Sequence, residues 1–472
     1  MDRAAALARP LPLEHPLAAL DALAGLPGAF LFHSSLPGRG ARWSLFGADP
    51  FATFRGGDWA RAVALTRGFA ARVEPAGEAP PFTGGLAGYW AYDFGRRFER
   101  LREAARDDLG LPDFVAGLYD VVGAFDHDSR RAWAFATGLP HAGAARARRA
   151  RRRLEAFVRR FERSAARAPG AAADWPPKAA GAPRALASTF DPDGYRRAVR
   201  AVIEHIARGD IFQANLSQRW TLPLPEGASS ARFGRALSHA LARHSPAPHA
   251  AHFDAGDHAV ASASPERFLA LRGRMVETRP IKGTRPRHAD PARDRAAARA
   301  LETSAKDRAE NVMIVDVLRN DLGRVCETGS ITVPGLCELE EFAQVWHLTS
   351  TIHGRLAAAH DAFDLLRACM PGGSISGAPK IRAMEIIDRL EPVRRHIYTG
   401  ALGWVGWNGD ADWSIAIRTA LVTADAVRFH AGGAVTADSD PDGEHEETLH
   451  KAEGLRQALG TLVGPLALTG AP

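Results

Sequence analysis

Short apolar runs interrupted by glycine and proline dominate the first 130 residues of the chain. They lie at 28–35, 43–54, 82–94 and 114–126, and the last of them reads FVAGLYDVVGAFD. Runs of this length, bounded by turn-forming residues, are typical of β-strands joined by tight turns. We therefore predict a β-rich amino-terminal region over 1–140.

Three segments of the second half begin with an Asp or Ser that can cap a helix, and each ends at a glycine. Proline follows the capping Asp in two of them, and in the third Ser304 and Asp307 resemble a capping box. These start and stop signals predict helices over 191–209, 304–323 and 440–460.

Strand-like runs also occur in the second half, at 211–220, 267–271, 413–422 and 426–433. Strands and helices mix without a strict βαβ alternation, which favours an α+β or large layered-sheet fold over a doubly wound parallel sheet. The amino-terminal strands alternate too little to close a sheet alone. We therefore expect both halves to form one compact α/β sandwich.

The two halves are joined by a segment of different composition. A basic helix and an Ala/Pro-rich linker occupy 141–187, and the linker itself, 166–187, has no periodicity. The mixed α and β region that follows spans 188–465.

Composition excludes several classes of protein. With 46% hydrophobic and 24% charged residues, the 472-residue chain is not a disordered one. Its three cysteines cannot form a disulfide framework, and no C-x-x-C pair is present. No apolar run reaches the roughly 18 residues of a membrane helix, and the N-terminus does not resemble a signal peptide. We expect a soluble, cytoplasmic protein without a membrane partner.

The net charge of +6 is concentrated in one segment, because residues 146–163 hold nine arginines and two glutamates. The apolar positions Leu154, Phe157, Val158 and Phe161 indicate an amphipathic surface helix. The alternative is a basic arm that binds nucleic acid. We favour the first interpretation and expect no nucleic-acid partner, because no aromatic-plus-basic pattern accompanies the arginines.

Two of the predicted helices carry carboxylate pairs. Asp307 and Glu310 are three residues apart, as are Glu444 and Glu447, and Lys451 follows one turn later. Two such pairs on separate helices would form an oxygen-only site, which suits Mg²⁺. The structural alternatives are that Asp307 only caps its helix and that Glu447 only pairs with Lys451. The residues alone favour these alternatives.

Two further residues are candidates for nucleophilic or acid–base chemistry. Lys282, in RPIKGTRPR (279–287), is a candidate nucleophile or base, and a surface lysine in a basic turn is the structural alternative. Glu266 precedes an apolar strand and would be a general acid if burial raised its pKa, whereas an ion pair with Arg267 is the structural alternative.

Glycine-rich segments and histidines complete the candidates. PGGSISGAPK (371–380) is not a P-loop, because Ala378 stands where lysine is required. This segment and HAGGA (430–434) would still let backbone N–H groups approach a carboxylate. The histidines lack the spacing of a metal site, so we interpret four of them as surface residues: His244, His249, His252 and His258.

Together these segments resemble the chorismate-binding enzymes, a family that includes anthranilate synthase component I, aminodeoxychorismate synthase component I and the isochorismate and salicylate synthases. The resemblance covers about 188–460, and 25–130 resembles the amino-terminal half of the amidating members. It rests on these segments: SPERF (264–268), RPIKGTRPR, KDRAENVMIVDVLRNDLGRV (306–325), HLTST (347–351), PGGSISGAPKIRAMEIIDRLEP (371–392), YTGALGWVG (398–406), AIRTALV (416–422) and DSDPDGEHEETLHKAEG (438–454). It implies a large two-sheet α/β sandwich.

One residue distinguishes the branches of this family. Anthranilate synthases are expected to carry PIAGT, whereas the aminodeoxychorismate branch carries PIKGT, as this chain does at Lys282. The resemblance therefore implies conversion of chorismate and ammonia to 4-amino-4-deoxychorismate, for p-aminobenzoate and folate synthesis. Anthranilate or isochorismate formation by the same fold is the alternative.

The resemblance also implies a role for each site residue. Mg²⁺ would be held by Glu310 and Glu447, with Glu444 and Asp307 helping directly or through water. Arg418, Tyr398 and Lys451 would bind the enolpyruvyl carboxylate, beside the backbone of Gly432 and Gly433. Lys282 would attack the ring, Glu266 would protonate the departing hydroxyl, His347 would lie near the ring and Thr284 would line the pocket.

Ammonia needs a source that this sequence does not contain. The three cysteines lie within or near the chorismate-binding motifs, so the implied partner is a separate glutamine amidotransferase subunit. Amidating relatives often have a tryptophan pocket in the first half, for which Ser34 and Ser35 are the candidates. The chain also departs from the family at three glycine positions, which are His288, His396 and Ala434.

Overall fold

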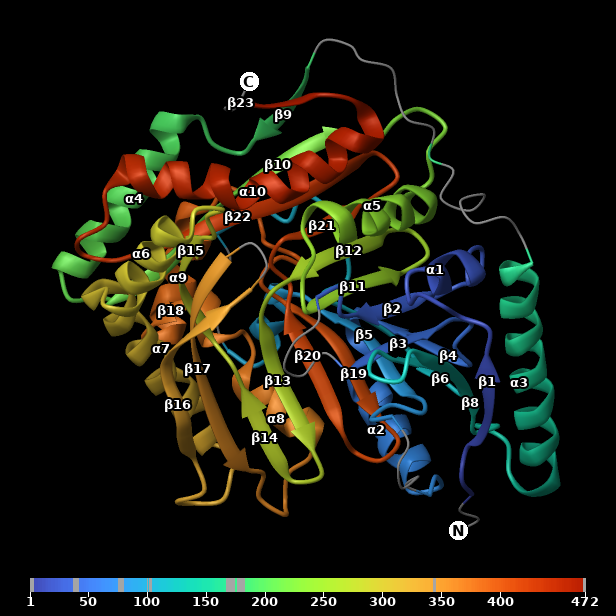
Figure 1. The fold of residues 1–472 in the computed structure, drawn as a ribbon. Coiled ribbons are helices and arrows are strands. Elements are labelled where there is room, and N and C mark those ends of the chain that lie inside the picture. The colour runs from blue at the N-terminus through green and yellow to red at the C-terminus, as the bar shows by residue number, and fades with distance from the viewer. Residues whose placement is uncertain are drawn as a thin grey trace.

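The structure, a computed structural model, describes residues 4–36, 42–74, 80–99, 101, 104–166, 175, 183–342 and 345–469. Two large β-sheets pack face to face, and helices cover their outer faces (Figure 1). This arrangement confirms the predicted two-sheet α+β sandwich.

The first sheet has 13 strands among the described residues, and β18 (Gly377–Ala378) pairs with β10 beside the main order. In spatial order the other strands are β1 (Leu7–Leu11), β8 (Arg131–Ala136), β7 (Val121–Asp126), β3 (Trp43–Gly47), β2 (Phe30–His33), β11 (His249–Asp254), β12 (Ala259–Ser264), β21 (Thr419–Val422), β22 (Ala426–Val435), β10 (Gln213–Pro223), β9 (Arg184–Ser188) and β23 (Leu466–Thr469). Among these described pairs only β9 and β23 run parallel.

The second sheet has 10 strands among the described residues, all paired antiparallel, and β16 (Thr332–Glu341) pairs with β17 beside the main order. In spatial order the others are β15 (Ile281–Pro286), β17 (Val345–Arg355), β14 (Met275–Thr278), β13 (Arg267–Arg272), β20 (Ala411–Ile415), β19 (Ala401–Gly406), β5 (Gly85–Trp90), β6 (Phe114–Tyr119) and β4 (Ala52–Arg55).

Helices pack on the outer faces of both sheets. The α-helices are α1 (Ala18–Ala22), α2 (Trp59–Ala70), α3 (Gly143–Ala165), α4 (Pro192–Ala207), α5 (Ser230–His244), α6 (Pro291–Glu302), α7 (Ala305–Gly323), α8 (Ala362–Cys369), α9 (Lys380–Leu390) and α10 (Pro441–Val463). Short 3-10 helices are η1 (Gly56–Asp58), η2 (Tyr92–Arg97) and η3 (Gly373–Ile375). Apolar side chains join α5 and α10 to the first sheet and α2, α7 and α8 to the second.

Each sheet contains strands from both halves of the chain. In the first sheet β2 pairs with β11, and in the second β5 pairs with β19. Between the sheets, Phe30 and Leu45 of the first form one buried cluster with Tyr89, Leu402 and Trp404 of the second. Because such a layer removes apolar surface from water on both sheets, it holds the two halves together.

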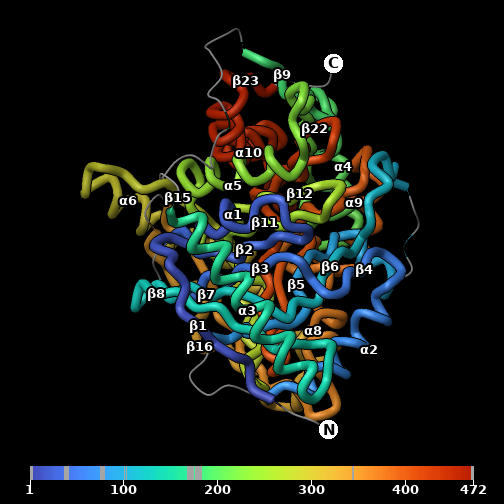
Figure 2. Tube along the Cα trace, turned by 90° about the vertical axis from the view of Figure 1, so that its right-hand side faces the viewer, coloured from blue at the N-terminus to red at the C-terminus, as the bar shows by residue number. Residues whose placement is uncertain are grey.

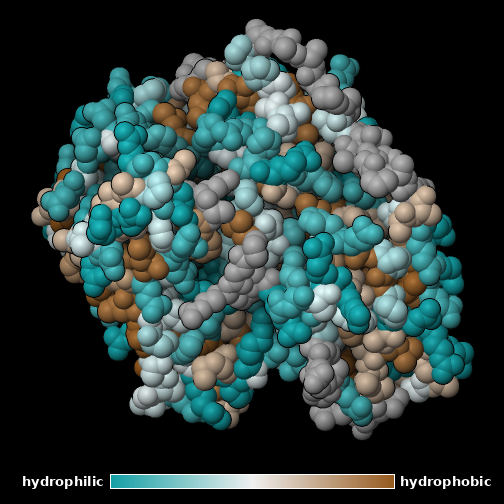
Figure 3. Space-filling view, viewed as in Figure 1, coloured by the Kyte–Doolittle hydropathy of each residue, from teal (hydrophilic) through white to brown (hydrophobic). Residues whose placement is uncertain are grey.

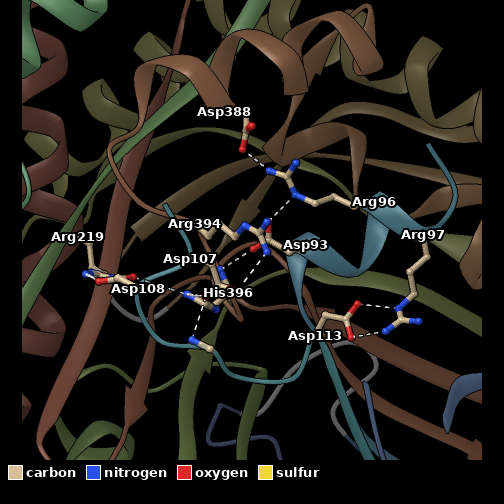
Figure 4. A network of polar contacts seen from close by, with 11 residues as sticks. Asp93, Arg96, Arg97, Asp107, Asp108, Asp113, Arg219, Asp388, Arg394 and His396 are labelled. Atoms are coloured by element: carbon tan, nitrogen blue, oxygen red, sulfur yellow. Dashed lines mark hydrogen bonds and ion pairs between the residues drawn. The ribbon is translucent and has the colours of Figure 1, made fainter. Parts of the chain in front are cut away.

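A polar network also joins the halves (Figure 4). Arg96, in η2, bonds to Asp93 in the same helix and to Asp388 on α9. The backbone N–H of His396 donates a 3.0 Å hydrogen bond to the other oxygen of Asp93. His396 has a φ of +50°, a conformation that glycine adopts more easily. The backbone at His396 is therefore strained.

Local capping signals position two helices correctly. The side chain of Asp191 caps α4 by accepting from the Gly194 N–H, and Ser304 caps α7 by accepting from the Asp307 N–H. The predicted end of the third helix at Gly460 is wrong, because α10 continues to Val463 and ends at Gly464, whose φ is +91°. Glycine in that left-handed conformation is a common helix stop.

The prediction of one strand over 413–422 is also wrong. Residues Ala411–Ile415 form β20 of the second sheet, and Thr419–Val422 form β21 of the first. The chain crosses from one sheet to the other between them, and Arg418 in this crossing has a φ of +50°. Apolar residues stand on both sides of Arg418 because both strands are buried, so the apolar pattern does not mark the crossing.

The basic helix α3 packs along the amino-terminal strands, in front of them in Figure 2. Its apolar positions Leu154, Phe157, Val158 and Phe161 are buried, as predicted. Arg149 and Arg153 each lie 3.0 Å from the buried carboxylate of Asp120. Part of the basic segment therefore anchors the helix. Most of the predicted linker, 167–174 and 176–182, lies outside the described residues, and β9 includes four residues assigned to it.

Two of the histidines interpreted as surface residues are buried. His252 Nδ1 lies 3.0 Å from the Ser238 hydroxyl, and His258 Nε2 lies 2.9 Å from the Tyr89 hydroxyl. Burial lowers the pKa of His252 to about 3. A hydrogen-bonded neutral imidazole fits a core strand, and spacing along the sequence does not reveal such partners.

The face in Figure 3 is mainly hydrophilic and is hollowed near its centre. Within the described part of the chain, every helix is too short or too polar to span a bilayer.

Candidate active site

Strand β15 approaches the first turns of α7 closely, and this contact brings Lys282 to Glu310. Lys282 Nζ lies 2.7 Å from Glu310 Oε1, with side chains 10% and 12% exposed. The neighbouring Gly283 has a φ of +84°, and a Cβ there would lie 3.1 Å from the Asp307 side chain. Glycine is therefore needed to let the strand reach the helix.

Glu266 lies between β12 of the first sheet and β13 of the second, and it is 5% exposed. Its Oε1 accepts a 2.7 Å hydrogen bond from the hydroxyl of Ser374, in η3. It does not pair with Arg267, which contacts Glu277 instead. Burial raises the pKa of Glu266 to about 7, although Ser374 and the charges of Lys282 and Lys451 oppose the rise. Such a carboxyl can hold a proton near neutral pH and release it to a substrate.

His347 and Thr284 face each other across β17 and β15, with Nδ1 and Oγ1 2.9 Å apart. Burial, followed by the nearby charge of Arg418, lowers the pKa of His347 to about 3, so its imidazole is neutral. Arg418 forms no ion pair with any residue that the structure describes, and burial alone lowers its pKa. A half-buried guanidinium that pairs with no described residue is suited to bind an anionic ligand.

Helix α10 contributes two carboxylates beside β22. The side chain of Ser439 donates a 2.6 Å hydrogen bond to Glu444 Oε1, and Lys451 Nζ lies 2.6 Å from Glu447 Oε1 and 2.9 Å from the Gly432 carbonyl. A Cβ on Gly433 would lie 2.6 Å from Glu444 Oε2 and 3.3 Å from Glu447 Oε1. Both carboxylates therefore lie against the bare Cα of Gly433.

The chemistry of these carboxylates fits a hard divalent cation. Glu444 Oε2 is buried and has no hydrogen-bond partner among the described residues. Burial raises the pKa of Glu444, and the charge of Glu447 adds to the rise, whereas the pKa of Glu447 is lowered because Lys451 and Lys282 outweigh its burial. In the described part of the chain no three His, Cys, Asp or Glu side chains are arranged to hold a metal ion. In the conformation shown, the ammonium group of Lys451 pairs with Glu447 Oε1.

Tyr398 lies beyond this group, in the loop that follows α9. Its ring stacks on His430 of β22, with centroids 4.9 Å apart and planes at 7°. Burial raises the pKa of Tyr398, which keeps its hydroxyl a hydrogen-bond donor, and burial lowers the pKa of His430 well below its usual value. The guanidinium of Arg395 lies 5.7 Å from the Tyr398 ring. The ring is thus held by two buried neighbours.

Some expected residues do not join this group. Asp307 contacts the guanidinium of Arg285 at 3.0 Å and not another carboxylate. Ser34 lines a separate cavity of about 90 Å³ between the sheets, with Trp43 and Trp404. A cavity of about 150 Å³ holds benzene, so an indole requires this cavity to widen. Ser35 instead exchanges hydrogen bonds with the backbone of Ala247.

Sequence reasoning missed four residues of this region. Ser374 and His430 contact predicted site residues directly, and the charge of Lys306 acts on both Glu444 and Glu447. Gln213, on β10, is fully buried, and neither of its amide atoms has a hydrogen-bond partner in the part of the chain that the structure describes. A buried polar group without a partner is rare and often marks a functional site. Only the polarity of Gln213 within an apolar strand could have signalled it.

Comparison with known proteins gives one consistent family. The family described as chorismate binding enzyme matches residues 35–457. Anthranilate synthase component 1 of Streptomyces coelicolor is 41% identical over 94% of this chain and 86% of its own length. Aminodeoxychorismate synthase component 1 of Klebsiella aerogenes is 41% identical over 80% of this chain and 78% of its own. The crystal structure of anthranilate synthase component I from Streptococcus pneumoniae TIGR4 superposes with a TM-score of 0.74 and 30% identity, covering 89% of this chain and 93% of that one.

Proposed function

Because the chain belongs to the chorismate-binding enzyme family, we propose that it converts chorismate and ammonia into 4-amino-4-deoxychorismate. The observation that carries this proposal is Lys282. It stands where the anthranilate synthases of the family are expected to carry alanine, and it is a buried amine on the wall of the candidate site. Relatives of both kinds are equally similar, so overall identity does not choose between them.

Chorismate carries two carboxylates, and side chains of the site offer cations for one of them. Arg418, Tyr398 and Lys451 hold the enolpyruvyl carboxylate, through a guanidinium that forms no ion pair with a described residue, a protonated hydroxyl and an ammonium. Arg and Lys bind carboxylates as a planar fork and a point charge respectively, which fixes the orientation of the substrate. The backbone of Gly432 and Gly433 lets the substrate approach β22.

The ring carboxylate needs a further positive charge. Glu310, Glu447 and Glu444 would hold Mg²⁺, with Asp307 acting through water, because its side chain is directed to Arg285. When bound, Mg²⁺ supplies the charge that binds and polarises this carboxylate.

The chemistry then needs a nucleophile and an acid. As the neutral amine, Lys282 Nζ bonds to ring C2, the two ring double bonds shift, and the C4–O bond breaks. Glu266 gives its proton to the departing hydroxyl, which leaves as water. Ammonia bonds to C4, its surplus proton passes to Glu266, and the double bonds shift back as the lysine leaves C2. The sum is chorismate plus ammonia giving aminodeoxychorismate plus water. Neutral His347 and Thr284 line the ring.

Ammonia comes from a separate glutamine amidotransferase subunit in this proposal. The support is the name of the relatives, each of which is called component 1. Anthranilate formation is the second candidate, favoured by the wider span of the match to the Streptomyces coelicolor protein.

Product analysis tests the proposal. Purified protein is incubated with chorismate, Mg²⁺ and ammonium, and the products of the natural chain and of Lys282→Ala are identified by mass. We expect aminodeoxychorismate from the natural chain and a rate loss of about 10²-fold or more in the variant. Lys380→Ala is the matched control, because Lys380 pairs with Asp321 on the same helix α7, outside the site. Anthranilate from the natural chain would overturn the branch, and no turnover with an added amidotransferase would overturn the reaction.

A further inference from the structure

The two carboxylates expected to hold the metal are each bonded to a lysine. Lys282 Nζ lies 2.7 Å from Glu310 Oε1, and Lys451 Nζ lies 2.6 Å from Glu447 Oε1. The first pair joins β15 to α7 and is nearly buried, whereas the second lies along α10 with both side chains more than 40% exposed. The two pairs belong to one group, because the charge of Lys282 also acts on Glu447.

The third carboxylate of the group has an unused oxygen. Glu444 Oε2 is buried beside Glu447 and against Gly433, and no residue in the described part of the chain hydrogen-bonds to it. A buried carboxylate oxygen without a donor is costly. The group therefore has a buried acceptor with no described donor on one side, while Lys282 and Lys451 pair with Glu310 Oε1 and Glu447 Oε1 on the other.

We propose that Lys282 is an internal counter-cation that competes with the divalent metal for Glu310, so that metal binding and release of Lys282 are one event. This inference rests on the proposed function, since it takes Glu310 and Glu447 as the metal ligands. Two cations near one carboxylate repel each other, and the repulsion is strong where both side chains are about one-tenth exposed. The metal therefore binds Glu310 only when the ammonium moves away.

The same contact holds the nucleophile back. While Nζ of Lys282 is bonded to Glu310, it is not available to ring C2 of the substrate. Displacement by the metal frees the side chain at the moment when the site becomes able to bind the ring carboxylate. Lys451 competes more weakly in the same way, because water screens its exposed pair with Glu447.

Metal affinity in the absence of substrate tests the competition without measuring turnover. Mn²⁺ is titrated into the full chain and free Mn²⁺ is followed by electron paramagnetic resonance, with Mg²⁺ as competitor. We expect Lys282→Met to bind Mn²⁺ at least about fivefold more tightly than the natural chain, and Lys451→Met to gain less. Lys282→Gln keeps a hydrogen-bond donor without the charge and shows the same gain.

Two controls separate competition from other effects. Lys380→Met removes a lysine that is 2.5 Å from Asp321 on the same helix, and it leaves Mn²⁺ affinity within about twofold. Glu310→Gln weakens binding, and thermal unfolding confirms that each variant is folded. Unchanged or weaker affinity in folded Lys282→Met and Lys282→Gln overturns the competition and leaves the metal site standing. Binding by none of the proteins overturns the metal site and the competition together.

Discussion

Ser374 donates a 2.7 Å hydrogen bond to the buried carboxyl of Glu266 and so joins the glycine-rich segment before α9 to the crossing between the two sheets. This bond stabilises the charged carboxylate, yet burial is the larger effect and raises the pKa of Glu266 to about 7. A carboxyl in this condition is protonated below neutral pH and can act as a general acid. The opposing effects of burial and of the Ser374 hydrogen bond on the pKa of Glu266 can be measured.

The rate should fall with pH as Glu266 loses its proton. Because only the protonated form can protonate the departing hydroxyl, kcat/KM is expected to decline tenfold per pH unit above about pH 7. Glu266→Gln cannot donate this proton, so its rate is lower by about 10²-fold and lacks this decline. A steady-state profile of both proteins checks this, and a natural chain with a constant rate through this range would contradict the role of Glu266.

Removing the serine should move the same decline. Ser374 lowers the pKa of Glu266, so Ser374→Ala raises it further, and the decline shifts to higher pH by up to about one unit. Ser376→Ala is the matched control, because its hydroxyl donates to the Gly372 carbonyl at 2.6 Å and does not contact Glu266. The shift should appear in the first variant and be absent from the second.

The free energy of unfolding should also depend on pH through the titration of Glu266. The pKa of Glu266 is higher in the folded chain, about 7, than its usual value of 4.5. The folded state therefore holds more protons between these values, and the free energy of unfolding falls as pH rises from about 4.5 to about 7. Glu266→Gln removes this contribution. Its stability relative to the natural chain should rise by up to about 3 kcal/mol across that range, measured by urea unfolding.

Local signals in the sequence predict individual elements well, and they fail where the tertiary structure decides. Asp191 and Ser304 cap their helices as expected, because a cap depends on neighbours within four residues. The run 413–422 divides between two sheets, and the turn at Arg418 is fixed by packing that no local pattern contains. A continuous apolar run cannot distinguish one buried strand from two.

In the candidate site, too, the sequence predicts some features and not others. The motifs identify Lys282, Glu310 and Glu447 as chemically important, but not their contacts, because β15, α7 and α10 meet only in the folded chain. His430 was missed because a lone histidine on a strand has no sequence signal of stacking on Tyr398. Lysine pairing with Glu447, a structural alternative raised by the sequence, is present alongside the group of carboxylates.

His430 should position Tyr398 for substrate binding. Its imidazole is 7% exposed and nearly parallel to the Tyr398 ring, so His430→Ala lets the ring move and is expected to raise KM for chorismate about fivefold with a smaller change in kcat. His430→Phe keeps a flat ring at this place and restores most of the affinity. Equal loss in both variants, or a loss confined to kcat, would argue against positioning by stacking.

Two glycines of neighbouring elements should respond to alanine in opposite ways. At Gly433 a Cβ would lie 2.6 Å from Glu444 Oε2, so Gly433→Ala displaces that carboxylate and weakens Mn²⁺ binding by about tenfold, with a stability loss of about 1–3 kcal/mol. At Gly460, within α10, a Cβ meets nothing within 4 Å. Gly460→Ala should therefore raise the free energy of unfolding by about 0.5–1 kcal/mol and leave Mn²⁺ affinity unchanged. Neither glycine has a positive φ, so backbone strain does not distinguish the two alanine variants. The difference in Mn²⁺ affinity between them therefore reports the contact with Glu444. Tight Mn²⁺ binding by Gly433→Ala would exclude this carboxylate from the metal site.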